Sequence, residues 1–131
     1  MINHTIETKT SPVILTFQLQ KEKEPAIASI CKSLGIRLSA VPAKDYAQKL
    51  GYLAGVKGFP REKSIYDGMP FPAEMLVFSG LNSDQVDAFL AEYKKTGLPA
   101  IGLKAIVTPH NVFWTAEALF RELMKEHLSF R

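Results

Sequence analysis

The residue types with the greatest chemical potential gather in one short segment, residues 108–114. It holds a hydroxyl at Thr108, an imidazole at His110, a carboxamide at Asn111 and the single tryptophan, Trp114. An imidazole titrates near neutral pH and acts as a general base when a nucleophile or an acid stands beside it. The adjacent sequence offers no Ser, Cys or acidic partner to His110, which favours an exposed turn histidine over a catalytic base.

Each polar group near a predicted strand end also has a structural interpretation. Asn111 is expected to close an Asx-type turn onto the following backbone, and Trp114 to anchor the next helix on a sheet. Ser79 and Asn82 lie between a buried strand and a helix, where free backbone N–H groups could hold an anion. Because that segment lacks the glycine run and lysine of a phosphate loop, ordinary helix capping is favoured there.

Cysteine and histidine usage limits the chemistry further. The single cysteine, Cys31, excludes an intrachain disulfide, and the absence of a Cys/His cluster argues against a thiolate zinc site. Cys31 falls on the apolar stripe of a predicted helix, so we expect a buried, unreactive thiol. We therefore predict no metal, cofactor or catalytic residue.

Composition and charge favour an ordinary globular domain. The 131 residues are 47% hydrophobic and carry a net charge of +3, with the basic residues spread along the chain beside Glu or Asp. A nucleic-acid-binding protein needs its cations clustered on one face, so a nucleic-acid partner is disfavoured. The polar N-terminus and the absence of an apolar run of about 20 residues predict no signal peptide and no membrane span, and hence a cytoplasmic protein.

The elements that must position these groups occur twice along the chain. Each half is expected to form a strand, an amphipathic helix, a second strand, a proline and a second helix. The predicted strands are residues 13–17, 36–41, 75–78 and 101–107, and the predicted helices include 25–34 and 43–54. Helix positions Ile27, Ile30, Cys31 and Leu34 correspond to Val86, Phe89, Leu90 and Tyr93 with a constant offset of 59 residues. This regularity indicates an internal duplication.

The predicted fold class is α/β, with pseudo-duplicated βαβα units forming one four-stranded mixed sheet packed with helices. We expect a poorly ordered lead-in (residues 1–11) and one domain (12–131), made of a first half (12–56), a linker (57–73) and a second half (74–131). Short β-α-β connections make each pair of strands parallel. The strand order 2-1-3-4 is preferred, while the relative direction of the two pairs stays open. Five large apolar residues in the linker predict that it packs on the body, or forms a contact surface.

Part of the second half resembles the domain-of-unknown-function family 3783, which comprises small bacterial proteins without an assigned activity. The resemblance covers about residues 75–123. The residues that carry it are Leu76, Val77, Phe78 and Gly80, the helix from Gln85 to Leu90, Leu103 to Ala105, Thr108, Pro109, Asn111 and Trp114. The resemblance implies a compact α/β domain and no substrate. It also directs attention to Lys104, Thr108, Asn111 and Trp114, although Lys104 also suits an edge strand with its amine in solvent.

Two functional hypotheses follow. The first is a non-enzymatic binding, regulatory or protein-interaction module, with a homodimer or another protein as partner. The alternative is a small-anion or metabolite-binding protein, or an enzyme, with its site at the turns after Phe78 and Val107. Ser79, Asn82, Lys104, Thr108, His110, Asn111 and Trp114 are the candidate ligand-binding residues.

Overall fold

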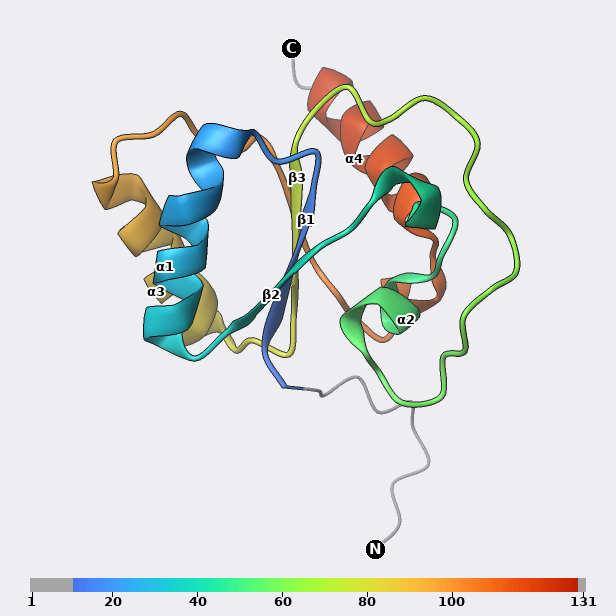
Figure 1. Ribbon diagram of the computed structural model, residues 1–131, viewed down its shortest axis with the longest axis horizontal. Helices are drawn as coiled ribbons and strands as arrows, with labels where there is room; N and C mark the ends of the chain where they lie inside the picture. The colour runs from blue at the N-terminus through green and yellow to red at the C-terminus, as the bar shows by residue number, and fades with distance from the viewer. Residues whose placement is uncertain (1–10, 130–131) are drawn as a thin grey trace, which may run out of the picture.

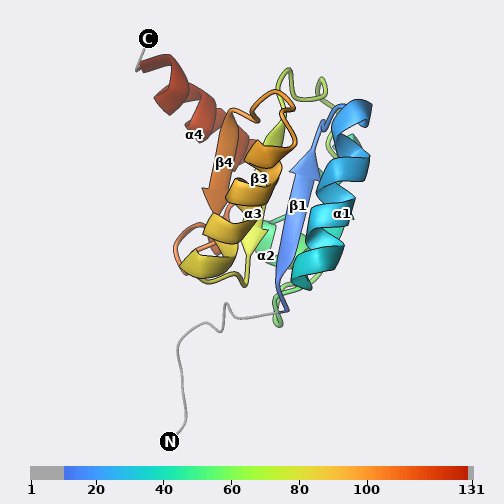
Figure 2. The same ribbon diagram turned by 90° about the vertical axis from the view of Figure 1, so that its left-hand side faces the viewer.

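The computed structural model describes residues 11–129, so the expected lead-in lies outside the described residues apart from Ser11. A central sheet has α1 (Glu24–Leu34) and α3 (Ser83–Lys95) on one face and α2 (Leu50–Ala54) and α4 (Ala116–Ser129) on the other (Figure 1). Figure 2 shows α1 and α3 side by side in front of the strands. The fold is thus a three-layer α/β arrangement.

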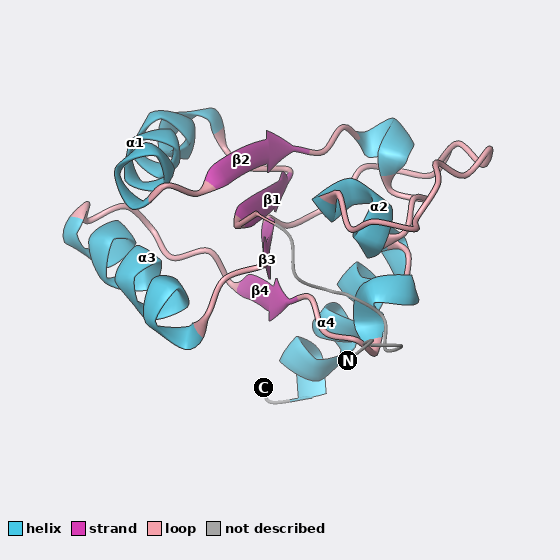
Figure 3. Cartoon of the chain, turned by 90° about the horizontal axis from the view of Figure 1, so that it is seen from below, coloured by secondary structure: helices cyan, strands magenta, loops and turns pink. Residues whose placement is uncertain are grey.

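The sheet confirms the predicted fold class and strand order. Its strands are β1 (Val13–Phe17), β2 (Arg37–Ala40), β3 (Met75–Ser79) and β4 (Leu103–Ile106), in the order β2-β1-β3-β4 (Figure 3). The pairs β1–β2 and β3–β4 are parallel, and β1 runs antiparallel to β3 with Leu15 opposite Val77. The carboxyl ends of β1 and β2 therefore lie beside the amino ends of β3 and β4.

Two apolar cores lie on the two faces of the sheet. Beneath α1 and α3, Ile14, Leu76 and Phe78 pack with helix residues that include Cys31 and the half-buried Leu90. Beneath α2 and α4, the opposite face of the same strands packs with a second set of apolar residues: Leu50, Val112, Leu119 and Phe120. The equivalent helix positions Cys31 and Leu90 thus share one core, as their spacing predicts.

Local sequence signals place most helix boundaries correctly. Pro25 lies in the first turn of α1, where a missing N–H costs no hydrogen bond, and Gly35 ends that helix at a φ of 70°. Asn82 and Gln85 form the expected capping box at the start of α3. Thr115 caps α4, because its Oγ1 accepts the N–H of Ala118 at 3.1 Å.

The prediction of one helix over residues 43–54 is wrong. The chain instead forms a 3₁₀ turn, η2 (Ala43–Asp45), and the short α2, with Lys49 extended between them. There Leu50 N–H donates to the carbonyl of Trp114 at 2.8 Å. The buried side chain of Gln48 binds the backbone N–H and carbonyl of Glu62 at 2.8 and 2.9 Å. These long-range hydrogen bonds replace the helical ones.

The linker packs on the α2 and α4 side of the molecule, as expected. Phe71 is buried and stacks on Tyr46 at 3.8 Å and on Phe120 at 4.1 Å between ring centroids. Ile65 and Met69 remain exposed, at 68% and 82%. The linker therefore contributes to the second core while leaving two large apolar side chains in solvent.

The two outer strands are more exposed than the sequence pattern predicts. The alternation in residues 36–41 suggests one better-buried face, but β2 is an edge strand and its Leu38 is 38% exposed. Both outer strands are shorter than expected, since their flanking apolar residues lie in the adjoining loops. None of the helices within residues 11–129 has the length and apolar character that crossing a membrane requires.

Candidate functional site

The segment 108–114 forms a turn that is closed by its own polar groups. Thr108 Oγ1 accepts the N–H groups of His110 at 3.2 Å and Asn111 at 3.0 Å. Asn111 Oδ1 accepts the N–H of Thr108 at 2.8 Å, and its Nδ2 donates to the carbonyl of Ile106 at 3.0 Å. Asn111 therefore closes the turn onto the preceding backbone, opposite to the predicted direction.

Trp114 lies where this turn joins α4. Its ring is half-buried against the second core and meets the His110 ring edge-on at 5.6 Å between centroids. Its carbonyl accepts the N–H of Leu50, which ties the start of α4 to α2. This position suits the interpretation of Trp114 as an anchor.

Ser79, Asn82 and Lys104 do not join this turn. Ser79 is fully buried at the end of β3, where its Oγ has no hydrogen-bond partner, and Asn82 is engaged in the cap of α3. Lys104 projects from the edge strand β4, and its Nζ donates to the carbonyl of Ile101. Across residues 11–129, no hydrogen bond connects Ser79, Asn82 or Lys104 to the 108–114 turn.

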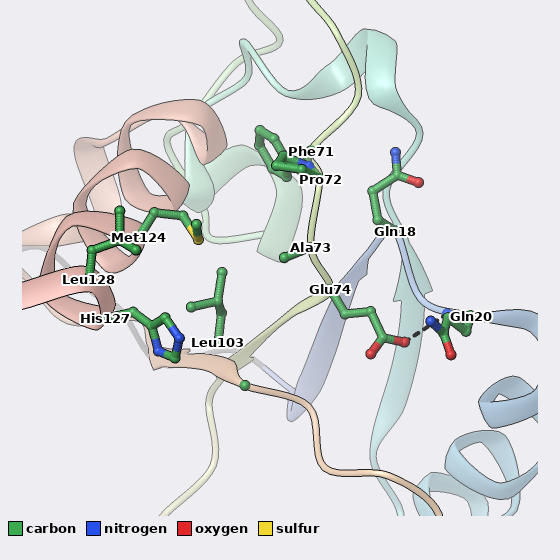
Figure 4. Close-up of a pocket in the computed structure, with 11 residues that line it drawn as sticks. Gln18, Gln20, Phe71, Pro72, Ala73, Glu74, Leu103, Met124, His127 and Leu128 are labelled. Carbon is green, nitrogen blue, oxygen red and sulfur yellow. Dashed lines mark hydrogen bonds between the residues drawn. The ribbon is translucent and has the colours of Figure 1, made fainter. Parts of the chain in front are cut away.

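A pocket of about 520 Å³ opens at the opposite end of β3 and β4, which we call the strand-end pocket. Figure 4 shows Gln18, Gln20 and Glu74 on one side and Leu103, Met124, His127 and Leu128 on the other, with Phe71 and Pro72 between them. The first three residues form its polar wall, whereas Leu103, Met124 and Leu128 form its apolar wall. The pocket is therefore amphipathic.

A buried ion pair supports the polar wall. Lys23, in the 3₁₀ turn η1 (Lys21–Lys23), places its Nζ 2.6 Å from Glu74 Oε1, and the two side chains are 3% and 13% exposed. The second carboxylate oxygen of Glu74 accepts the N–H of Gln20 at 2.8 Å. Burying an ammonium and a carboxylate costs roughly several kcal/mol in desolvation. Because either charge alone would be left uncompensated, the buried arrangement is stable only while both partners are present.

The loop that carries the polar wall is also conformationally strained. Gln18 has a φ of 56°, the single positive value for a non-glycine residue in the described part of the chain. Such a backbone costs about 1–2 kcal/mol, and strained residues concentrate at ligand-binding sites. Buried charge and backbone strain thus occur together at the rim of one pocket.

The electrostatic influence of the ion pair reaches Tyr93 on α3. Burial raises the pKa of Tyr93, while Lys23 lowers it and Glu74 raises it. Lys23 and Glu74 bring one formal positive and one formal negative charge to the ion pair, so the pair has no formal net charge. The polar wall therefore presents hydrogen-bonding groups with little net charge.

Sequence reasoning missed the strand-end pocket. Lys23 lies in a charged turn typical of solvated surface, and Glu74 lies 51 residues later at the end of the linker. The antiparallel β1–β3 pairing brings the two together, and the sequence left that pairing open. The sequence contained one weak indication of this pocket, which is that the acidic residue Glu74 directly precedes the continuously apolar strand 75–78.

The fold and pocket define a small three-layer α/β domain with a ligand-sized cleft at one end of its sheet. Residues 74–130 match the family described as Domain of unknown function (DUF3783), which confirms the resemblance inferred from this half of the chain. The match covers β3, α3, β4 and α4. No curated protein sequence and no solved structure matches the chain.

Proposed function

We propose that this protein is a non-enzymatic binding module that holds a small neutral molecule in the strand-end pocket. The observation that carries the proposal is the polar wall, where a strained loop and a buried ion pair stand opposite an apolar wall. A volume of about 520 Å³ falls within the range of small-molecule sites, roughly 300–1,000 Å³.

The neutrality of the ligand follows from the charges around the pocket. Lys23 compensates the carboxylate of Glu74, so the polar wall offers the carboxamides of Gln18 and Gln20 without a net charge to recruit an ion. Carboxamides both donate and accept hydrogen bonds. A ligand with an amide or hydroxyl edge and a compact apolar body fits both walls.

We favour binding over catalysis because both carboxylate oxygens of Glu74 already have hydrogen-bond partners within the protein. One of its oxygens binds Lys23 and the other binds the N–H of Gln20, so the carboxylate is not poised to take a proton from a substrate. Its role in the proposal is to hold the loop. Gln18 and Gln20 are the residues expected to contact the ligand.

We also propose a bacterial, cytoplasmic origin and an internal duplication. The buried free thiol of Cys31 suits a reducing compartment. The common order of strand, helix, strand, 3₁₀ turn and helix in both halves supports descent from a repeated unit. A homodimer stays a prediction of the sequence.

The test is a chemical-shift titration of the 15N-labelled protein with benzamide, benzyl alcohol and uracil as neutral probes. We expect saturable shifts for Gln18, Gln20 and Leu103 with at least one probe. Gln18→Gly removes a wall side chain and relieves the positive φ, so it should abolish those shifts while leaving the fold intact.

Ser33→Ala, an exposed change on α1, is the control and should bind as the unaltered protein does. A probe that shifts residues elsewhere, or that binds Gln18→Gly unchanged, would remove the support for this pocket. Absence of shifts with all three probes would count against a neutral ligand class.

A further inference from the structure

The two halves differ in the connection between their first helix and second strand. In the first half, Gly35 and Ile36 alone join α1 to β2, whereas residues 96–102 join α3 to β4. This longer loop lies on the side of the sheet away from α2 and α4. It therefore adds a wall, next to α3, that the first half lacks.

Side-chain hydrogen bonds hold this loop in place. Tyr93 Oη donates to the carbonyl of Pro99 at 2.7 Å, and Thr96 Oγ1 donates to the carbonyl of Tyr93 at 2.6 Å. The N–H of Leu98 donates to Thr96 Oγ1 at 3.1 Å. Because the loop is anchored at three points, the wall that it forms is organised before any ligand arrives.

A cavity of about 330 Å³ lies between this loop, α3 and β4, and we call it the α3–β4 cavity. Most of its lining is apolar: Leu76, Phe89, Leu90, Tyr93, Leu98, Ala100 and Ile101. Lys94 and Lys104 also line it, and both side chains are exposed. The lining includes no Asp or Glu, so two cations stand beside an apolar interior without a compensating acid.

We propose that the α3–β4 cavity binds a free alkyl carboxylate of medium length. The alkyl chain occupies the apolar interior, and the carboxylate pairs with the ammonium groups of Lys94 and Lys104. Lys104 donates one hydrogen bond to Ile101 and keeps two further donors for the ligand. This site is separate from the strand-end pocket, so the proposal for it can be tested independently of the proposed function.

Two features of the cavity select this class of ligand. Apolar burial strengthens binding about fourfold for each methylene group, so affinity should rise with chain length until the cavity is full. The two lysines of the lining favour an anionic head group over a neutral or cationic one on a chain of the same length. An alkyl amine places its ammonium against two like charges and should bind worst.

The experiment is isothermal titration with hexanoate, octanoate, 1-octanol and octylamine at one ionic strength. We expect octanoate to bind more tightly than hexanoate and at least tenfold more tightly than octylamine. Lys94→Gln combined with Lys104→Gln should weaken octanoate about tenfold and leave 1-octanol within twofold. Ala100→Phe, which fills the cavity from the loop, should weaken both.

Lys32→Gln is the matched control, because it removes an exposed lysine from the last turn of α1, the counterpart of α3. Amide chemical shifts of each variant establish that it is folded. Equal loss of octanoate binding in Lys32→Gln, or equal octanoate affinity in the double variant, would overturn the proposal. Failure of octanoate to bind saturably would also overturn it, as would binding to phosphatidylglycerol vesicles without binding of free octanoate.

Discussion

The ion pair between Lys23 and Glu74 predicts a large and asymmetric response to mutation. Glu74→Gln removes the carboxylate but leaves the ammonium of Lys23 in a site where its side chain is 3% exposed. An uncompensated buried charge costs about 3–5 kcal/mol, against about 5–15 kcal/mol for the total free energy of unfolding of a domain. We therefore expect Glu74→Gln to lose at least about a fifth of the free energy of unfolding.

The reverse change should cost less. Lys23→Met leaves Glu74 13% exposed and still hydrogen-bonded to the N–H of Gln20 at 2.8 Å, so we expect a loss of about 1–3 kcal/mol. The double variant removes both charges and retains similar side-chain volumes. Its stability should return to within about 1 kcal/mol of the unaltered protein, which makes the coupling energy at least about 3 kcal/mol.

Urea unfolding followed by the fluorescence of Trp114 measures all four proteins of this cycle. The control is Lys95→Met, which breaks an exposed pair with Glu92 at 2.9 Å, where the side chains are 72% and 47% exposed. Such a pair contributes about 0.5 kcal/mol or less. If Glu74→Gln lowers the free energy of unfolding by less than about 1 kcal/mol, or if its effect disappears in 0.5 M NaCl, the conclusion that this ion pair is buried from solvent is refuted.

Two further predictions concern the linker and the thiol. Gln48→Ala leaves the backbone N–H and carbonyl of Glu62 without their partner. We expect the free energy of unfolding to fall by about 2 kcal/mol and trypsin to cleave faster at Arg61. Unchanged cleavage would show that the aromatic contacts alone hold the linker. Burial raises the pKa of Cys31 from 9.0 to about 11, so the folded state keeps the thiol proton to higher pH than the unfolded chain. The contribution of the protonated thiol to the free energy of unfolding is therefore fully present below pH 9. It is lost as the pH rises towards 11, by up to about 3 kcal/mol. Cys31→Ala should flatten the measured pH dependence over that interval, and an unchanged slope would assign it to other groups.

The candidate residues near the turns after Phe78 and Val107 illustrate how far local patterns reach. The sequence correctly places Asn82 and Thr115 at helix starts, because capping depends on residues three positions apart. It also directs attention to Thr108 and Asn111, whose polar atoms close their own turn. Residue type alone does not distinguish a group that serves the backbone from one that serves a ligand.

The break in the predicted helix at Gln48 has a different cause. Local apolar spacing in residues 43–54 suits a helix, but Gln48 and Leu50 find partners at Glu62 and Trp114. Hydrogen bonds to distant segments replaced those within the helix. The local pattern of one sequence contains no information about which distant segment will supply the hydrogen-bond partners.

By itself, the sequence determined the buried strands, the amphipathic helices and their glycine ends, because each depends on neighbours within about one turn or one alternation. The tertiary structure alone decided that the two halves meet antiparallel. That choice places Lys23 against Glu74 and opens the strand-end pocket between the loop after β1 and α4. The physical reason is that such contacts join residues about fifty positions apart, where packing of the whole chain, and not local periodicity, determines which side chains meet.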